Sequence, residues 1–415
     1  MSATQRIPVP VYPSLENIST QLSLPQLLDL HLEHNPEFPL YVFANDESDP
    51  DRLTEISILE YVRVGAGAGP QPGEIVAIVA VLDSFVYSAL VAGMIKVGLV
   101  PFPISTFLPP DTIAQLIQGN NIHRIITTDA TLHSFLVSIR ENLDLTYRAE
   151  CIFEEAPGLS ILYPKLGRDT SQDDFSPLSN PFFPTDEGKD LALCMHSSGS
   201  TGVPKTIRFT HRAFKSFALI SDMIHQTGRK SRLTSLSGKP IRIAGFGFLL
   251  LLLLFHSSAV FTLIASALYG PSTIAVFPPA VTQPGALPVT ATPDNTIDHL
   301  KRTKATAILC FPHFISMFAR DEKAIEVLRE LDYVITGGGF VPTNAGDQLV
   351  SRGVRLRVTR AATECGGPTL ISTEDLDPED WSAFAFTKRV KVRWIPYGGG
   401  LFRCQFLVRI PFDLK

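Results

Sequence analysis

The sequence predicts an α/β protein with two lobes built on parallel-rich β-sheets and a partial, smaller β lobe. Two regions alternate apolar runs of strand length with helical patterns, and each predicts strands joined by crossover helices. Near its end the chain alternates apolar and polar residues instead, which predicts antiparallel strands. Hydrophobic residues make up 45% of the 415 and charged residues 19%, which is typical of a globular protein with a large core.

The first predicted lobe contains a strand–helix–strand unit. Ile75–Leu82 is an apolar run of strand length, Ser84–Lys96 has apolar residues at helical spacing, and Leu99–Ile104 is apolar again. This spacing is typical of a crossover between parallel strands. The other elements expected here are a helix at Leu24–His34, a strand at Tyr41–Ala44, a helix at Asp111–Gln118 and a strand at Ile122–Thr127.

Two histidines lie near the end of the helix expected at Leu24–His34. His31 and His34 could be read as a pair of metal ligands. No further ligands follow at a suitable spacing, so we expect a solvated helix end.

The second predicted lobe repeats the alternation of strands and helices. Its expected strands are Ala305–Cys310, Tyr333–Thr336 and Val354–Val358, and its expected helices are Glu322–Leu331 and Thr343–Arg352. Antiparallel hairpins are expected from Trp381 onward, with strands at Lys391–Ile395 and Cys404–Ile410. Between the two lobes, Thr210 is expected to cap a helix whose apolar face includes Ala213, Phe214, Phe217, Ile220 and Ile224.

The most apolar stretch of the chain is Phe246–Phe255, and its apolar character extends to Leu268. Together they approach the length of about 20 residues that spans a membrane. His256, Ser257 and Ser258 interrupt the stretch, and no basic residues flank its C-terminal end. We expect a buried core helix, with a membrane span as the alternative.

The strongest motif is HSSGSTGVPKT, residues His196–Thr206, directly after the apolar run Leu191–Met195. Its glycines let backbone N–H groups approach an anion, its hydroxyls add donors, and its lysine adds a positive charge. It is not a Walker loop, because Pro204 stands where that motif needs a glycine before the lysine. The motif predicts a polyphosphate site; an exposed turn is the alternative.

The ordered string Ser-Ser-Gly-Ser-Thr-Gly-x-Pro-Lys resembles the phosphate loop of the adenylate-forming superfamily. That superfamily includes acyl-CoA synthetases, luciferases and the adenylation domains of nonribosomal peptide synthetases. The resemblance extends over residues 22–410, which leaves residues 1–21 as an N-terminal leader. It implies that ATP is bound by the loop residues Ser197, Ser198, Gly199, Ser200, Thr201, Gly202 and Lys205.

A second segment, GGGFVPTNAGDQLVSRGVRLRVTRAATECGG at residues 337–367, resembles the same superfamily, and in particular the fungal adenylation domains of synthetase-like carboxylate reductases. The resemblance implies that the nucleotide base lies beside Gly337, Gly338 and Gly339. It also implies that Thr363 meets the α-phosphate and that Glu364 binds Mg²⁺, a hard cation that takes carboxylate and phosphate oxygens. Lys205, Thr363 and Glu364 are therefore the expected catalytic residues.

The chain departs from the family pattern just before Thr363. Arg360 and Ala361 stand where relatives have an aromatic residue and a glycine. A guanidinium can stack on a base as an aromatic ring does, but Ala361 adds a Cβ to the backbone.

The step Phe255-His256-Ser257-Ser258 resembles the aromatic–histidine step that borders the carboxylate pocket of acyl- and aryl-CoA synthetases. Amino-acid-activating relatives place an aspartate there to hold the substrate ammonium. His256 therefore implies an aryl or alkyl acid without an α-amino group. The alternative is a histidine that lies inside the core and makes its hydrogen bonds there.

The resemblance implies that the chain activates a carboxylic acid with ATP, forming an acyl-adenylate and releasing pyrophosphate. The acyl group would then pass to a thiol, either CoA or the phosphopantetheine of a carrier domain. The lysine-bearing C-terminal domain, the carrier domain and the reductase domain of fuller relatives have no counterpart in these 415 residues. A degenerate or truncated nucleotide-binding homologue without turnover is the alternative reading.

Composition argues against several other classes. The net charge of −5 provides no basic surface for nucleic acid. The five cysteines are scattered and form no C-x-x-C pair, which indicates a reducing compartment. The N-terminus has no basic region followed by an apolar core, so no signal peptide is expected. We therefore expect a cytoplasmic protein that is not bound to membranes.

Overall fold

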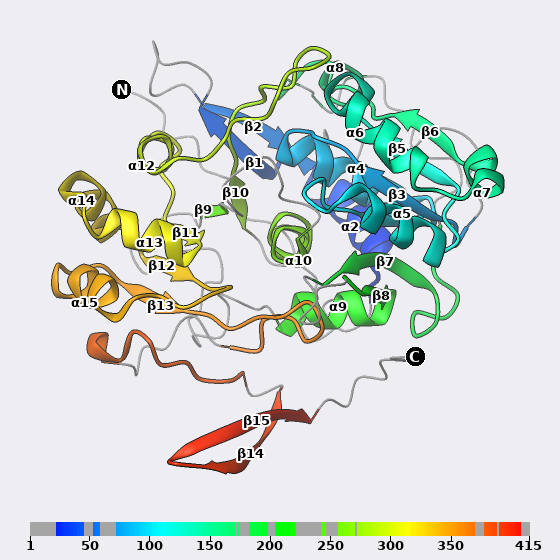
Figure 1. The fold of residues 1–415 in the computed structure, drawn as a ribbon. Helices are drawn as coiled ribbons and strands as arrows, with labels where there is room; N and C mark the ends of the chain where they lie inside the picture. Colours follow the sequence, from blue (N-terminus) through cyan, green and yellow to red (C-terminus); the bar gives the residue numbers. More distant parts are fainter. Residues whose placement is uncertain are drawn as a thin grey trace.

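The structure is a computed structural model, and it shows two sheet-based lobes and a C-terminal hairpin (Figure 1). It describes residues 22–44, 53–58, 72–168, 170, 173, 182–197, 204–220, 242–245, 256–269, 272–369, 377–387 and 390–407.

The larger sheet has seven strands in the order β13-β12-β11-β9-β10-β1-β2. They are β1 (Pro39–Ala44), β2 (Leu53–Ser57), β9 (Arg242–Gly245), β10 (Thr273–Ala275), β11 (Ala307–Cys310), β12 (Tyr333–Thr336) and β13 (Leu356–Val358). All neighbours pair in parallel except β1 and β2. The strand predicted at Tyr41–Ala44 therefore belongs to the same sheet as the strands of the second lobe.

The smaller sheet has four parallel strands in the order β4-β3-β5-β6. Its strands are β3 (Ile75–Val79), β4 (Val100–Pro103), β5 (Arg124–Thr127) and β6 (Ile152–Glu155). The helix between β3 and β4 is α4 (Ser84–Lys96), so the predicted crossover is confirmed. The lobe also contains α5 (Pro110–Gly119), α6 (Asp129–Glu141), α7 (Leu145–Glu150) and α8 (Leu159–Leu162).

Side chains of β1 alternate between two hydrophobic cores, as the pleat of a strand requires. Tyr41 and Phe43 join one core, together with α4, and Val42 joins the other. On α4, Phe85 stacks on Phe43 with the ring centroids 5.8 Å apart. Because α4 also packs on β3 through the same core, it lies between the two sheets and is buried along most of its length.

Four helices cover the face of the seven-stranded sheet that points away from α4 (Figure 1). They are α12 (Pro293–Arg302), α13 (Pro312–Phe318), α14 (Glu322–Glu330) and α15 (Thr343–Ser351). The last two match the predicted helices within a residue, whereas α12 and α13 were not predicted. On α15, Gly346 lies under the indole of Trp381, where a Cβ would come within 2.1 Å of the ring.

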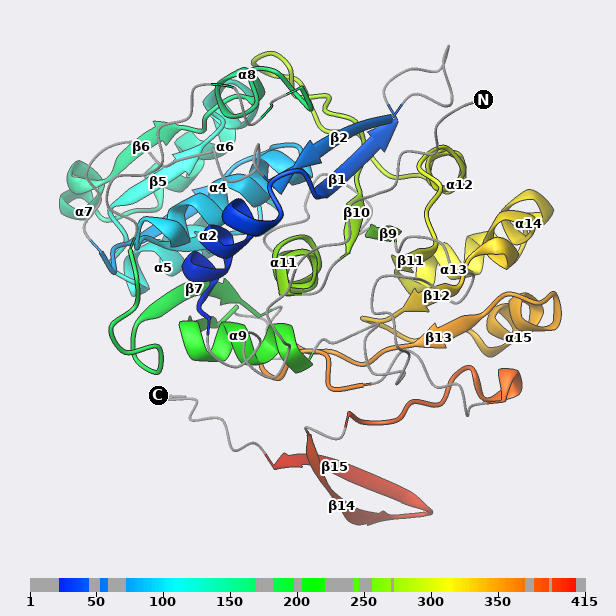
Figure 2. The same cartoon turned by 180° about the vertical axis from the view of Figure 1, so that it is seen from behind.

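The predicted helix at Leu24–His34 is confirmed as α2. The prediction that its end is solvated is wrong for His31. The His31 ring is buried, and its Nε2 donates to the carbonyl of Leu268 at 2.7 Å while its Nδ1 accepts from Asn35 at 3.1 Å. His31 thus joins α2 to α11 (Ala267–Tyr269), and the two helices lie close together in Figure 2.

The leucine-rich run at residues 246–255 lies outside the described residues. The chain after it forms α10 (Ser257–Val260), the π-helical segment η1 (Phe261–Ser266) and α11, and most of these residues are buried. Within the described part of the chain, no helix is long and apolar enough to cross a membrane.

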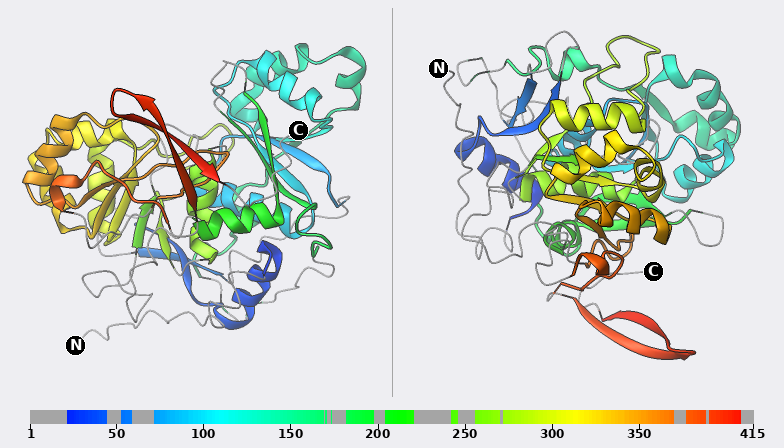
Figure 3. Two further views of the ribbon diagram at one scale, coloured as in Figure 1. Left: turned by 90° about the horizontal axis from the view of Figure 1, so that it is seen from below. Right: turned by 90° about the vertical axis from the view of Figure 1, so that its left-hand side faces the viewer.

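Two antiparallel hairpins complete the described chain. The first joins β7 (Leu191–His196) to β8 (Thr206–Thr210) and continues into α9 (His211–Ile220). The second joins β14 (Lys391–Gly398) to β15 (Leu401–Leu407), as predicted, after the short helix η2 (Pro378–Asp380). The second hairpin projects away from both sheets (Figure 3).

Candidate functional site

Three loops leave the seven-stranded sheet at the carboxyl ends of β11, β12 and β13. Since these strands are parallel neighbours, Phe311, Gly337 and Thr359 emerge at one edge of the sheet. In open α/β sheets, ligands bind outside this edge. The sequence-predicted glycines and the segment that carries Thr363 therefore lie where a ligand site is expected.

The glycine turn after β12 is packed too closely for side chains. A Cβ on Gly337 would lie 2.7 Å from the carbonyl oxygen of Thr359, and a Cβ on Gly338 would lie 2.8 Å from the Phe311 ring. Gly338 also has a φ of +83°, a conformation that glycine adopts at little cost. Glycine at these two positions thus lets the turn approach its neighbouring loops. Gly339 is exposed beside them.

Thr363 and Glu364 occupy a tight turn closed by two backbone hydrogen bonds between Ala362 and Gly366, at 3.1 and 2.8 Å. Thr363 is half-buried and Glu364 is exposed. The turn therefore presents a hydroxyl and a carboxylate next to each other.

His256 lies at the start of α10 and reaches this turn through its neighbour Ser257. The Ser257 hydroxyl is 3.1 Å from the hydroxyl of Thr363. The His256 ring meets Phe311 edge-on, with the ring centroids 6.4 Å apart. These contacts join His256, the glycine turn and Thr363 into one site.

The protonation of His256 follows from its contacts. Its Nδ1 accepts from the backbone N–H of Ser258 at 3.3 Å and lies 2.8 Å from the Ser258 hydroxyl. This pattern assigns the proton to Nε2. Desolvation by the surrounding protein lowers the pKa of His256, so the ring is neutral at pH 7. A neutral ring with Nε2–H is a hydrogen-bond donor without a charge.

The described part of the HSSGSTGVPKT motif forms the base of a hairpin loop. Ser197 N–H donates to the carbonyl of Lys205 at 3.0 Å, and Lys205 N–H donates to the Ser197 hydroxyl at 3.4 Å. Lys205 is exposed. The predicted phosphate-binding residues Ser198, Gly199, Ser200, Thr201 and Gly202 lie outside the described residues.

Two side-chain contacts anchor this hairpin to the smaller sheet. His196 Nε2 accepts from the backbone N–H of Ser105, after β4, at 3.1 Å. Thr206 Oγ1 accepts from Asn120, at the end of α5, at 2.8 Å. Burial lowers the pKa of His196 more than the hydrogen bond with the Ser197 carbonyl raises it.

The structure brings together some of the predicted residues and leaves others apart. Gly338, His256 and Thr363 are linked through Phe311 and Ser257, whereas no ion pair within the described residues joins Lys205 to Glu364. Sequence reasoning missed Phe311 and Ser257. Phe311 directly follows the predicted strand Ala305–Cys310, and Ser257 directly follows His256.

The chain is similar to known proteins. The family profile described as AMP-binding enzyme matches residues 66–389. The chain belongs to the AMP-binding enzyme family. The adenylate-forming reductase Nps9 of Serpula lacrymans var. lacrymans is 34% identical over 414 residues, which cover 97% of this chain and 36% of that protein. The predicted resemblance to fungal adenylate-forming reductases is thus confirmed.

Solved AMP-binding relatives share the fold at low sequence identity. The inhibitor-bound N-terminal domain of FACL13 from Mycobacterium tuberculosis is 18% identical with a TM-score of 0.64, and the match covers 92% of this chain and 86% of that one. ATP-bound MatB from Rhodopseudomonas palustris is 15% identical with a TM-score of 0.64, covering 92% and 68%. The predicted α/β class is confirmed. The chain spans about a third of the length of its first fungal relatives.

Proposed function

We propose that this chain binds ATP with Mg²⁺ and a carboxylic acid, and joins them as an acyl-adenylate with release of pyrophosphate. The observation that carries the proposal is the contact between Ser257 and Thr363, at 3.1 Å. It brings the segment of His256, the candidate carboxylate-binding residue, against the turn that carries the candidate α-phosphate and metal ligands. An acid and a nucleotide bound to these two segments would be neighbours.

The residues at the carboxyl edge fit ATP and Mg²⁺ in their chemistry. The buried hydroxyl of Thr336, directly before Gly337, has no hydrogen-bond partner among the described residues, although buried polar groups are normally paired. Glu364 offers an exposed carboxylate, the oxygen ligand that Mg²⁺ prefers. Lys205 offers an exposed ammonium for phosphate. Glu364 would hold the metal, and bound Mg²⁺ would supply neutralisation of phosphate charge.

The reaction is a displacement at phosphorus. A carboxylate oxygen of the acid attacks the α-phosphorus of ATP, and the bond from that phosphorus to the oxygen shared with the β-phosphate breaks. The electron pair leaves with pyrophosphate. Thr363 donates a hydrogen bond to an α-phosphate oxygen, while Lys205 and Ser197 hold the leaving phosphates. Preorganised donors of this kind lower the barrier where negative charge develops.

His256 selects the class of acid. Its neutral imidazole can donate one hydrogen bond from Nε2 to a carboxylate, but it provides no negative charge to balance an ammonium. The substrate is therefore an aryl or alkyl acid without an α-amino group. The acyl-adenylate then reacts with a thiol, that of CoA or of a carrier-bound phosphopantetheine.

Exchange of labelled pyrophosphate into ATP tests the proposal. The assay uses the purified chain, Mg²⁺ and a panel of aryl acids, alkyl acids and α-amino acids. We expect exchange that depends on an aryl or alkyl acid. Exchange driven only by amino acids would contradict the acid class, and no exchange with any acid would contradict turnover.

A nucleotide-binding homologue without turnover is the second candidate. Arg360 and Ala361 favour it, because they replace the aromatic residue and glycine of the family pattern and are both exposed beside the site. Calorimetry distinguishes the two candidates: ATP·Mg²⁺ binding without any exchange selects the second.

A further inference from the structure

Helix α9 contacts both the hairpin that carries Lys205 and the segment that follows His256. Its residue Phe217 is fully buried, and its ring lies edge-on to Phe209 of β8 with the centroids 5.1 Å apart. The same ring lies 5.0 Å from that of Phe261, in the segment after His256. Phe217 therefore packs against the strand that follows Lys205 and against the helical segment that follows Ser257.

Phe217 also supports the turn that carries Thr363 and Glu364. A Cβ on Gly366 would lie 3.0 Å from the Phe217 ring, and the three atoms nearest to that position all belong to Phe217. Gly366 has a φ of +69°, a left-handed conformation that glycine adopts at little cost. The turn thus packs against an aromatic side chain of α9.

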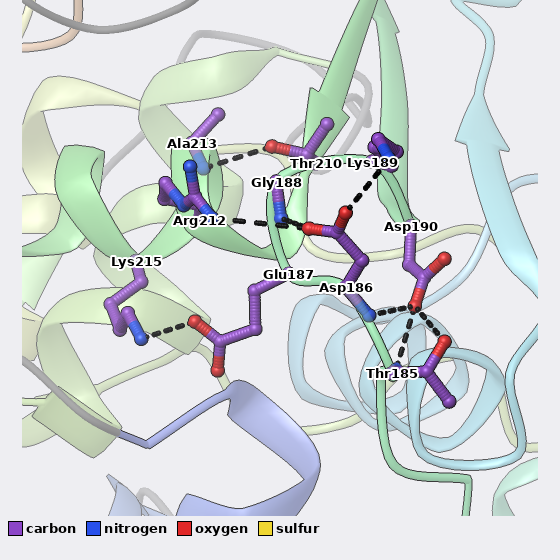
Figure 4. A network of polar contacts seen from close by, with 10 residues as sticks. All are labelled: Thr185, Asp186, Glu187, Gly188, Lys189, Asp190, Thr210, Arg212, Ala213 and Lys215. Atoms are coloured by element: carbon purple, nitrogen blue, oxygen red, sulfur yellow. Dashed lines mark hydrogen bonds and ion pairs between the residues drawn. The ribbon is translucent and has the colours of Figure 1, made fainter.

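The N-terminal end of α9 is tied to the strand that enters the phosphate loop. Arg212 N–H donates to the Glu187 carbonyl at 2.7 Å, and His211 N–H donates to the carbonyl of Asp190, the residue before β7, at 3.0 Å. Lys215, whose side chain is only 7% exposed, pairs with the Glu187 carboxylate at 2.5 Å (Figure 4). This partly buried ion pair joins α9 to the segment before β7.

The hairpin and the helix form one rigid unit as a consequence. A two-stranded hairpin is marginally stable alone, so its loop depends on what fixes the strands. Thr210 ends β8 and caps α9 by accepting from Ala213 N–H at 3.2 Å. Phe217 follows Thr210 by seven residues, which is a rise of about 10 Å along a helix. The helix thus sets the spacing between the phosphate-loop strands and Gly366.

We propose that Phe217 is a positioning residue: α9 is a spacer that holds the Thr363–Glu364 turn in register with β7 and β8, the two strands of the hairpin that carries Lys205. The inference rests on the proposed adenylation. Because Thr363 and Glu364 act on the reacting phosphate, displacement of their turn would lower kcat more than it changes the KM for the acid.

Phe214 provides a matched control for Phe217. It lies one turn earlier on α9, is 1% exposed, and packs on the same Phe261 ring at 5.5 Å. We expect Phe217→Leu and Phe214→Leu to lower the thermal midpoint similarly. In pyrophosphate exchange, Phe217→Leu should lower kcat at least tenfold with the acid KM within twofold, and Phe214→Leu should keep kcat within twofold. Equal kcat for the two variants would overturn the inference.

Hydrogen exchange measured by mass spectrometry gives a readout that needs no activity. Peptides that cover residues 360–367 should exchange at least threefold faster in Phe217→Leu and at the wild-type rate in Phe214→Leu. Unchanged protection in Phe217→Leu would overturn the inference. If the wild type shows no pyrophosphate exchange, the proposed function fails, and this measurement still decides whether Phe217 holds the turn.

Gly366→Ala perturbs the same contact from the other side, should Phe217→Leu not fold. The added Cβ would press on the Phe217 ring at 3.0 Å, and alanine would also strain the backbone at a φ of +69°. We expect the same faster exchange of residues 360–367 and the same loss of kcat. A variant with wild-type values in both would contradict the proposed role.

Discussion

The hydroxyl groups of Ser257 and Thr363 lie 3.1 Å apart, although 106 positions separate the two residues in the chain. Ser257 begins α10 beside His256, and Thr363 lies in the turn after β13. Their contact connects the segment proposed to bind the acid with the segment proposed to bind the α-phosphate. Substitutions at Thr363 and at the other proposed site residues therefore test the proposed roles in catalysis and in ATP binding.

Thr363→Ala is expected to lower kcat for pyrophosphate exchange about 100- to 1,000-fold, since one hydrogen bond to developing charge is lost. Thr363→Ser keeps the hydroxyl and should retain most of the activity. The comparison requires kcat and KM for ATP and for the acid in both variants. Equal loss in the alanine and serine variants would show that the threonine methyl group matters instead of the hydroxyl.

Lys205→Ala should weaken ATP·Mg²⁺ binding about tenfold or more, because a cation facing phosphate is lost. Titration calorimetry measures the affinity directly. Lys323→Ala, at an exposed lysine on α14, is the control and should leave the affinity unchanged. An unchanged affinity in Lys205→Ala would exclude the loop assignment.

Gly337→Ala is expected to destabilise the protein by about 1–3 kcal/mol, the usual cost of overpacking. Its Cβ would lie 2.7 Å from the Thr359 carbonyl oxygen, so the glycine turn must move and the KM for ATP should rise. Gly158→Ala is the control, since a Cβ there meets nothing within 4 Å. Urea unfolding and exchange kinetics check both variants; a Gly337→Ala protein with wild-type stability would show that the turn adapts.

Stability should depend on pH through two buried histidines. Burial lowers the pKa of His211 and of His299 from 6.5 to about 4. Between pH 4 and pH 6.5 the unfolded chain binds more protons than the folded protein. The contribution of the two histidines to the free energy of unfolding is therefore fully present above pH 6.5 and is lost as the pH falls toward 4. Urea unfolding at pH 7 and pH 5 measures the loss.

His299→Gln tests the origin of that pH dependence. The variant removes one titrating group on α12, where the ring packs on Phe277 at 4.8 Å. We expect a lower stability at pH 7 and a smaller difference between pH 7 and pH 5 than in the wild type. The same difference in both proteins would assign the effect to other groups.

Local patterns predicted several elements closely. The helices Leu24–His34 and Ser84–Lys96 and the strand Tyr333–Thr336 have the predicted bounds. Each is long or strongly periodic, or ends at glycine, so its signal lies within its own residues. The strands β9 and β10 were not predicted.

The sequence by itself determined the fold class and the resemblance to adenylate-forming enzymes, and it supplied the candidate site residues, since periodicity, glycine placement and ordered motifs are local properties. Only the tertiary structure decided that β1 joins the strands of the second lobe, that His31 is buried against Leu268, and that Ser257 meets Thr363. These pairings depend on which apolar faces are buried together across long chain separations. The pattern of a few consecutive residues does not specify which faces are buried together.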